Sequence, residues 1–240
     1  MRARAFLFAL LLTPPAASAA SKEVPLRTAD GCELSAFYLA PSSGAFVFVN
    51  THGLGSDKEE WAPFQAALAK AGFGYLSLDM RGHGGSAKCG GKPVSYRSFT
   101  PADWNAASRD IEAASAWLAR KGVPLSRQVF CGASIGANLS LKAAAEGAAG
   151  APAGVALLSP GLDYAGVPGG PWLAAGRRFR LFIAASQDDP YAWRSSAALS
   201  LAANRNGLKV RFVFGKGGHG VAMFRDPEFA GRLTEWILEK

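Results

Sequence analysis

A strand, a tight turn and a helix follow one another without an intervening loop between residues 128 and 148. The apolar run 128–133 predicts a buried strand, and a helix is expected from about residue 135 to 148. Between them lies Gly132-Ala133-Ser134-Ile135-Gly136, a Gly-x-Ser-x-Gly pattern typical of a sharp turn that exposes the serine hydroxyl. Glycine at both ends avoids side chains that would collide where the two backbones approach. The pentapeptide alone also fits a Gly-rich loop, so Ser134 needs support from the rest of the chain.

Other strands and helices alternate along the chain at the spacing of βαβ units. Largely apolar runs, which are typical of strands buried on both faces, lie at 45–50, 75–79 and 155–159, and further strands are expected at 179–185 and 209–214. Helices are expected over about 57–71, 100–120, 190–204 and 227–238, and an edge strand of a hairpin at 33–39. The predicted fold class is α/β, a three-layer α/β/α sandwich with a mostly parallel, twisted sheet. Residues 20–240 are expected to form a single domain.

The N-terminal segment 1–19 has the pattern of a signal peptide. A basic start with Arg2 and Arg4 precedes the apolar stretch 5–12, and the small residues 17–19 fit a cleavage site. Cleavage is expected near Ala19 or Ala20, which predicts an exported protein, periplasmic or secreted. The apolar stretch is shorter than the about 20 residues that span a bilayer, so no stable membrane span is expected after cleavage.

Charge and cysteine content limit the partners and the redox chemistry. The formal net charge is +8, but the basic residues are scattered, and we expect no nucleic-acid partner. Cys131 falls in the predicted strand before the turn and is expected to be a buried apolar filler. Cys32 and Cys89 are the pair that would form a disulfide in an exported protein. The cysteines and histidines show no metal-ligand spacing, and the sequence does not define the oligomeric state.

A nucleophilic serine needs a base, and the base needs a carboxylate that orients it. In a strand-turn-helix arrangement these residues follow in the order serine, acid, histidine. His219, in a Gly-rich loop after the last predicted strand, is the histidine that follows Ser134. We therefore predict that His219 is the base.

The acid should lie between Ser134 and His219, at the end of a strand. Asp188 and Asp189 directly follow the apolar run 179–185. Asp189 is well placed to cap the helix that begins at Pro190. We assign Asp189 to this capping role and therefore predict that Asp188 orients the imidazole. Asp189 and Asp163 remain alternatives.

Two backbone N–H groups should bind the oxyanion that forms during acyl transfer. One is expected from Ile135, directly after the serine, and the other from Leu54, in the loop after the run 45–50. His52 and His83 are interpreted as structural residues that hold their loops by hydrogen bonds.

Five segments in this order resemble the α/β-hydrolase family, in its small bacterial serine-hydrolase (esterase) branch, which is related to dienelactone hydrolase-like and lysophospholipase-like members. They are His52-Gly53-Leu54-Gly55, Asp79 to Ser86, Gly132 to Gly136, Asp188, and His219-Gly220. The chain departs from the family at Ala185, where the family often has glycine. Relatives similar to dienelactone hydrolase use a cysteine nucleophile, so their activity does not transfer to Ser134.

The resemblance implies a serine hydrolase that cleaves carboxylic esters through an acyl-enzyme, without a cofactor. Its partner would be a small-molecule or acyl-ester substrate. The segment 160–178 is too short for a helical cap domain, which predicts an open site with a wall lined by Leu162, Tyr164, Val167, Trp172 and Leu173. A peptidase or an acyltransferase with the same residues, or a non-catalytic binding protein with this fold, are the alternatives.

Overall fold

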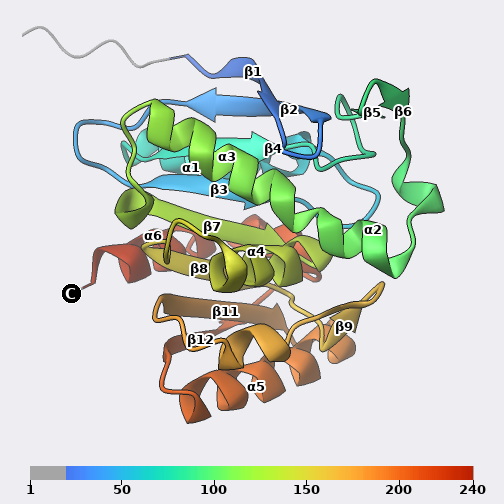
Figure 1. Ribbon diagram of the computed structural model, residues 1–240. Coiled ribbons are helices and arrows are strands. Elements are labelled where there is room, and N and C mark those ends of the chain that lie inside the picture. The colour runs from blue at the N-terminus through green and yellow to red at the C-terminus, as the bar shows by residue number, and fades with distance from the viewer. Residues whose placement is uncertain (1–19, 240) are drawn as a thin grey trace, which may run out of the picture.

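A twisted sheet of ten strands forms the centre of the computed structural model, which describes residues 20–239 (Figure 1). The predicted signal peptide, 1–19, lies outside the described residues. The strands follow one another across the sheet in the order β12 (Lys209–Gly215), β11 (Arg180–Ser186), β8 (Gly154–Leu158), β7 (Gln128–Ala133), β3 (Val47–Thr51), β4 (Gly74–Leu78), β2 (Cys32–Leu39), β5 (Lys88–Cys89) and β6 (Lys92–Pro93). β1 (Lys22–Arg27) pairs with β2. The strands from β12 to β4 are parallel, and β2 is antiparallel to its neighbours.

Helices cover both faces of this sheet (Figure 1). On one face, α1 (Ala62–Lys70) and α6 (Phe229–Leu238) enclose an aromatic-rich core that includes Phe64 and Trp236. On the other face, α3 (Ser108–Arg120), α4 (Ile135–Glu146) and α5 (Pro190–Arg205) pack over a mainly aliphatic core that includes Ile111 and Leu139. The continuous apolar runs of the sequence arise because β3, β4, β7 and β8 are buried along their whole length. The α/β/α sandwich predicted from the sequence is confirmed.

Two local predictions differ from the structure. The helix expected over 100–120 is divided into α2 (Pro101–Ala106) and α3, with Ala107 between them. The strand β2 is not an edge strand, since β1, β4 and β5 all pair with it. Polar and apolar residues alternate along β2 because successive side chains point to opposite faces of the sheet, and one of these faces is partly exposed.

Short elements connect the main layers. Four 3-10 helices were not anticipated: η2 (Tyr96–Ser98), η3 (Leu125–Arg127), η4 (Pro171–Ala174) and η5 (Gly220–Arg225). The helix expected over 57–71 begins as a 3-10 helix, η1 (Lys58–Trp61), and continues as α1. Between β8 and β11 the chain forms a hairpin of β9 (Asp163–Tyr164) and β10 (Val167–Pro168), followed by η4. This segment is too small to be a cap domain, in line with the prediction. Within residues 20–239, no helix has the length and apolar character needed to cross a bilayer.

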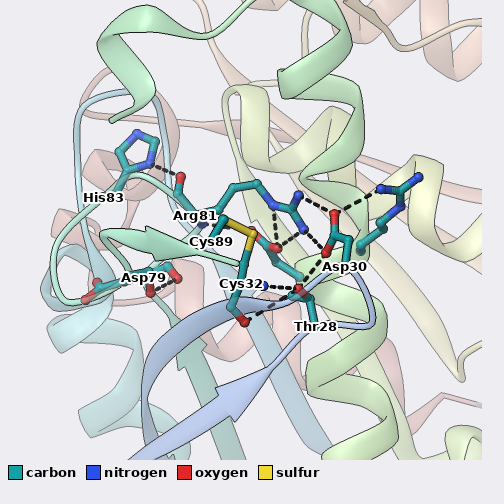
Figure 2. The surroundings of a disulfide bond; sticks show 10 residues. Thr28, Asp30, Cys32, Asp79, Arg81, His83 and Cys89 are labelled. Carbon is teal, nitrogen blue, oxygen red and sulfur yellow. Dashed lines mark hydrogen bonds and ion pairs between the residues drawn. A yellow bond between two sulfur atoms is a disulfide. The ribbon is translucent and has the colours of Figure 1, made fainter. Parts of the chain in front are cut away.

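The predicted cysteine pairing is confirmed. Cys32 of β2 and Cys89 of β5 form a disulfide, and Cys131 of β7 is free and buried. The disulfide lies beside the ion pair between Arg81 and Asp30 (Figure 2). The disulfide ties β2 to β5, in the segment that follows β4.

Candidate active site

Ser134 lies at the sharp turn between β7 and α4, as the Gly-x-Ser-x-Gly pattern predicts. Its φ angle is 57°, in the left-handed region that residues with a side chain rarely adopt. A Cβ on Gly132 would collide with the carbonyl of Gly136, and a Cβ on Gly136 would collide with the carbonyl of Thr51. The ends of β7, β3 and α4 therefore meet this closely only with glycine at both positions. The surrounding packing holds Ser134 in its strained conformation.

The loop after β3 borders Ser134. A Cβ built on Gly53 would lie 3.4 Å from the Cβ of Ser134. The backbone N–H of Gly53 donates to Oε1 of Glu60 at 3.0 Å, and burial raises the pKa of this carboxyl above its usual value. Among residues 20–239, no hydrogen-bond acceptor contacts the backbone N–H of Leu54 or of Ile135. These two groups lie on the segments that border the serine, and their role toward an oxyanion stays a prediction.

His52 and His83 support the loops around the serine, as expected. Nδ1 of His52 lies 2.7 Å from the carbonyl oxygen of Gly53, and Nε2 accepts a hydrogen bond from the Met80 N–H at 3.0 Å. This arrangement requires a neutral ring that donates from Nδ1, and burial lowers the pKa of His52 to about 4. His83 stacks on Tyr96 with the ring centroids 4.1 Å apart.

His219 is held by Asp189, and the prediction that Asp188 fills this position is wrong. Nδ1 of His219 contacts Oδ2 of Asp189, whereas the carboxylate of Asp188 accepts a hydrogen bond from Oγ of Ser186 at 3.1 Å. Oδ1 of Asp189 accepts from the N–H of Ala192 at 3.2 Å and caps α5. A carboxylate has two oxygens, so the capping role that we assigned to Asp189 leaves the second oxygen for the imidazole.

The loop that carries His219 is fixed to the ends of two strands. The N–H of Gly220 donates to Oγ of the buried Ser159, directly after β8, at 2.9 Å. A Cβ on Gly220 would lie 3.2 Å from the Cβ of Ala133, the residue before Ser134. His219 is thus brought to the end of β7, beside the serine. Ser159 was not anticipated, although its place directly after a buried strand is the signal that could have indicated it.

Tyr164 of the β9–β10 hairpin contacts both residues of this site. Its hydroxyl donates to the carbonyl of Ser159 at 3.2 Å and lies near the hydroxyl of Ser134. Its ring meets the ring of His219 edge to face, with centroids 6.3 Å apart and planes at 86°. The sequence predicted Tyr164 only as part of an apolar wall. Asp163, an alternative for the acid, accepts instead from the Gly166 N–H at 2.8 Å within the hairpin turn.

The loop after β4 is anchored by buried charges. Asp79 is fully buried and accepts from Nζ of Lys58 and from the N–H of Gly85, both at 2.8 Å. This loop also supports the segment that carries Leu54, since Nε2 of His83 accepts from the N–H of Gly55 at 3.4 Å.

Another residue of the loop after β4, Arg81, joins two carboxylates. Its guanidinium donates to Asp110 and to Asp30, each at 2.8 Å (Figure 2). Burial alone would raise the pKa of Asp30, but hydrogen bonds from Arg81, Thr28 and Arg109 hold it well below its usual range. The backbone N–H of Arg81 also donates to Asp110, at 2.8 Å, so these charges fix the backbone of the loop.

Neither a metal-binding cluster nor a reactive thiol is found among residues 20–239. Within the described part of the chain, no three His, Cys, Asp or Glu side chains are grouped to hold a metal ion. Burial raises the pKa of the Cys131 thiol well above its usual value, so the thiol stays protonated in the core.

The sequence of the chain matches a known protein family. Residues 42–205 match the family model described as serine aminopeptidase, S33. The chain belongs to this family. It is a serine hydrolase with the α/β-hydrolase fold, and the matched region includes Ser134 and Asp189 but ends before His219. No curated protein matches the chain in sequence.

Solved structures of hydrolases share the fold of this family member. An esterase from Pyrococcus furiosus is 18% identical with a TM-score of 0.72, and 96% of this chain aligns with 94% of that one. A thermophilic esterase from Thermogutta terrifontis is 15% identical with a TM-score of 0.68, over 90% of this chain and 98% of that one. A dienelactone hydrolase from Anabaena variabilis is 14% identical with a TM-score of 0.67, over 91% and 95% of the two chains. At such low sequence identities, the structural similarity shows a shared fold and nothing further.

Proposed function

We propose that this serine hydrolase cleaves carboxylic esters, with Ser134 as nucleophile, His219 as general base and Asp189 as the acid that orients it. The observation that carries the proposal is the contact of His219 Nδ1 with Asp189 in a loop packed against the residue before Ser134. A carboxylate at Nδ1 fixes the tautomer in which Nε2 is free to accept a proton.

The reaction follows from these positions. His219 takes the proton of Ser134 as Oγ attacks the ester carbonyl, and the N–H groups of Leu54 and Ile135 stabilise the oxyanion. His219 then returns the proton to the leaving alcohol, and water hydrolyses the acyl-enzyme by the same steps. The strained turn at Ser134 keeps its hydroxyl at the carboxyl end of the sheet, where the substrate arrives. No step requires a cofactor.

The surroundings of Ser134 favour small or extended acyl esters over long chains held in a tunnel. Only the β9–β10 hairpin and η4 separate β8 from β11. Two apolar side chains on the loops of this edge, Leu54 and Leu162, are 56% and 50% exposed. An open site with apolar sides would bind a short acyl chain and leave the rest of the substrate in solvent.

A peptidase is the second candidate, because the description of the matching family names a serine aminopeptidase. The same three residues would attack an amide carbonyl, with a poorer leaving group. Comparing the hydrolysis of an ester and an anilide with the same acyl group distinguishes the two activities. An anilide cleaved as fast as the ester would favour the peptidase.

We also propose that the protein is exported and loses residues 1–19. The signal-peptide pattern supports export, and the Cys32–Cys89 disulfide is of the kind that persists in oxidising compartments. The intact mass of the protein from the exported fraction tests this. A mass that begins at Met1 would contradict export by this route.

The experiment that tests the esterase proposal is hydrolysis of p-nitrophenyl esters with acyl chains of two to twelve carbons. We expect turnover with short chains and a loss of at least about 10³-fold in kcat for Ser134→Ala. Equal turnover by this variant would refute Ser134 as the nucleophile. A strong preference for the longest chains would contradict the open site.

A further inference from the structure

The β9–β10 hairpin is a rigid element beside the candidate nucleophile. The buried Asn138, in α4, donates to the carbonyls of Gly161 and Val167 at 2.9 and 2.8 Å, and its Oδ1 accepts from the N–H of Gly161 at 3.1 Å. Ala165 and Gly166, at the tip, have φ angles of 51° and 81°, which fits a two-residue type I′ turn. The hairpin is therefore fixed to α4, the helix that directly follows Ser134.

A second set of contacts holds the tip and the start of the hairpin. Nδ2 of Asn105 donates to the carbonyl of Gly166 at 2.7 Å. The hydroxyl of Tyr191, in α5, donates to the carbonyl of Asp163 at 2.7 Å, next to Tyr164. These bonds fix the backbone on both sides of Tyr164, so its side chain is directed at a defined place.

The hydroxyl of Tyr164 is held by Ser159 and lies near Ser134. It donates to the carbonyl of Ser159 at 3.2 Å, a long bond, and the hydroxyl of Ser134 is close enough to affect the pKa of the phenol. Burial, with the negative charge of Asp189 adding to it, raises the pKa of this phenol above its usual value. Tyr164 therefore keeps its proton and remains a hydrogen-bond donor at neutral pH.

The position of Tyr164 defines which atom of the substrate it would meet. The leaving oxygen must lie within reach of His219, because His219 returns the proton to it. The oxyanion would lie on the other side, toward the N–H groups of the loop after Gly53. The ring of Tyr164 meets the ring of His219, and its hydroxyl lies near that of Ser134, so this hydroxyl is on the side of the leaving group.

We infer that Tyr164 is a catalytic residue whose hydroxyl donates a hydrogen bond to the leaving oxygen of the ester. The inference rests on the proposed function. As the bond from Ser134 Oγ to the acyl carbon forms, the serine proton passes to His219. That proton then moves to the leaving oxygen as its bond to carbon breaks. Tyr164 turns its O–H from the Ser159 carbonyl to the leaving oxygen and retains its own proton throughout.

The test uses two esters that share one acyl group, an ethyl ester and a p-nitrophenyl ester. An alkoxide carries far more charge on the leaving oxygen than p-nitrophenolate, so it gains more from a hydrogen bond. The ratio kcat/KM reports acylation, in which the alcohol leaves. For Tyr164→Phe we expect kcat/KM to fall about 10- to 100-fold for the ethyl ester and less than about 3-fold for the p-nitrophenyl ester.

Tyr191→Phe is the matched control. It removes a neighbouring phenol that holds the same hairpin, with the two rings 5.5 Å apart. Asn105 and Asn138 still hold the hairpin in this variant, so its ratio of ethyl to p-nitrophenyl rates should stay at the native value. Equal losses on both esters in Tyr164→Phe, or the same change of ratio in Tyr191→Phe, would overturn the role of Tyr164.

Labelling with a fluorophosphonate separates this result from a failure of the proposed function. The native protein and Tyr164→Phe should both be labelled at Ser134, since fluoride leaves without help. If the native protein is neither labelled nor active on either ester, the proposed function fails and the role of Tyr164 fails with it. If labelling is normal and the ratio is unchanged, only the role of Tyr164 fails.

Discussion

Replacing Asp188 or Asp189 with asparagine, one at a time, tests which carboxylate orients His219. In Asp189→Asn the amide oxygen can still cap α5 through the Ala192 N–H, since asparagine and aspartate are about equally good caps. The change in the free energy of unfolding should therefore stay below about 0.5 kcal/mol. The negative charge at Nδ1 of His219 is lost, however, and in triads of this kind that change lowers kcat by about 10⁴-fold.

Asp188→Asn is the matched control for this prediction. It changes only the partner of the Ser186 hydroxyl, and kcat should stay within about 5-fold of the native value. Initial rates on a short p-nitrophenyl ester, with urea denaturation of each variant, measure both quantities. The reasoning is refuted if Asp188→Asn abolishes turnover, or if Asp189→Asn retains more than about a tenth of it.

Two further predictions concern stability. Burial lowers the pKa of His52 to about 4. Between pH 6.5 and pH 4 the unfolded chain therefore binds a proton at His52 that the folded chain does not bind. The free energy of unfolding should fall by about 3 kcal/mol as the pH drops through this window. His52→Gln keeps an acceptor for the Met80 N–H and should remove most of this slope in urea titrations, whereas an unchanged slope would contradict the assignment. Reduction of the Cys32–Cys89 disulfide, which closes a loop with a sequence separation of 57, should lower the free energy of unfolding by about 4 kcal/mol. The variant with serine at both positions should not respond to reductant, and a native protein that also does not respond would contradict this contribution.

The sequence predicted the sheet and most of the site because both depend on local patterns. Strands buried on both faces appear as continuous apolar runs, and the Gly-x-Ser-x-Gly turn requires glycine for steric reasons that act within five residues. The position of His219 also followed from chain order. The choice between Asp188 and Asp189 failed because capping and binding of the imidazole were treated as exclusive, although each needs only one carboxylate oxygen.

The roles of Tyr164 and Ser159 could not be predicted in the same way. Both depend on long-range contacts, such as the bonds from Asn138 to the hairpin and from the Gly220 N–H to Ser159. A two-residue strand with alanine at a left-handed position of its turn carries no clear hairpin signal. Such tertiary placement is visible only when the whole sheet is assembled.

The most direct test of the account is to map the site of fluorophosphonate modification by peptide mass spectrometry on the folded protein. One adduct per chain, on Ser134, is predicted, and it should be absent from Ser134→Ala and strongly slowed in His219→Gln. An adduct on another residue, or no adduct on the folded native protein, would contradict Ser134 as the nucleophile of this enzyme.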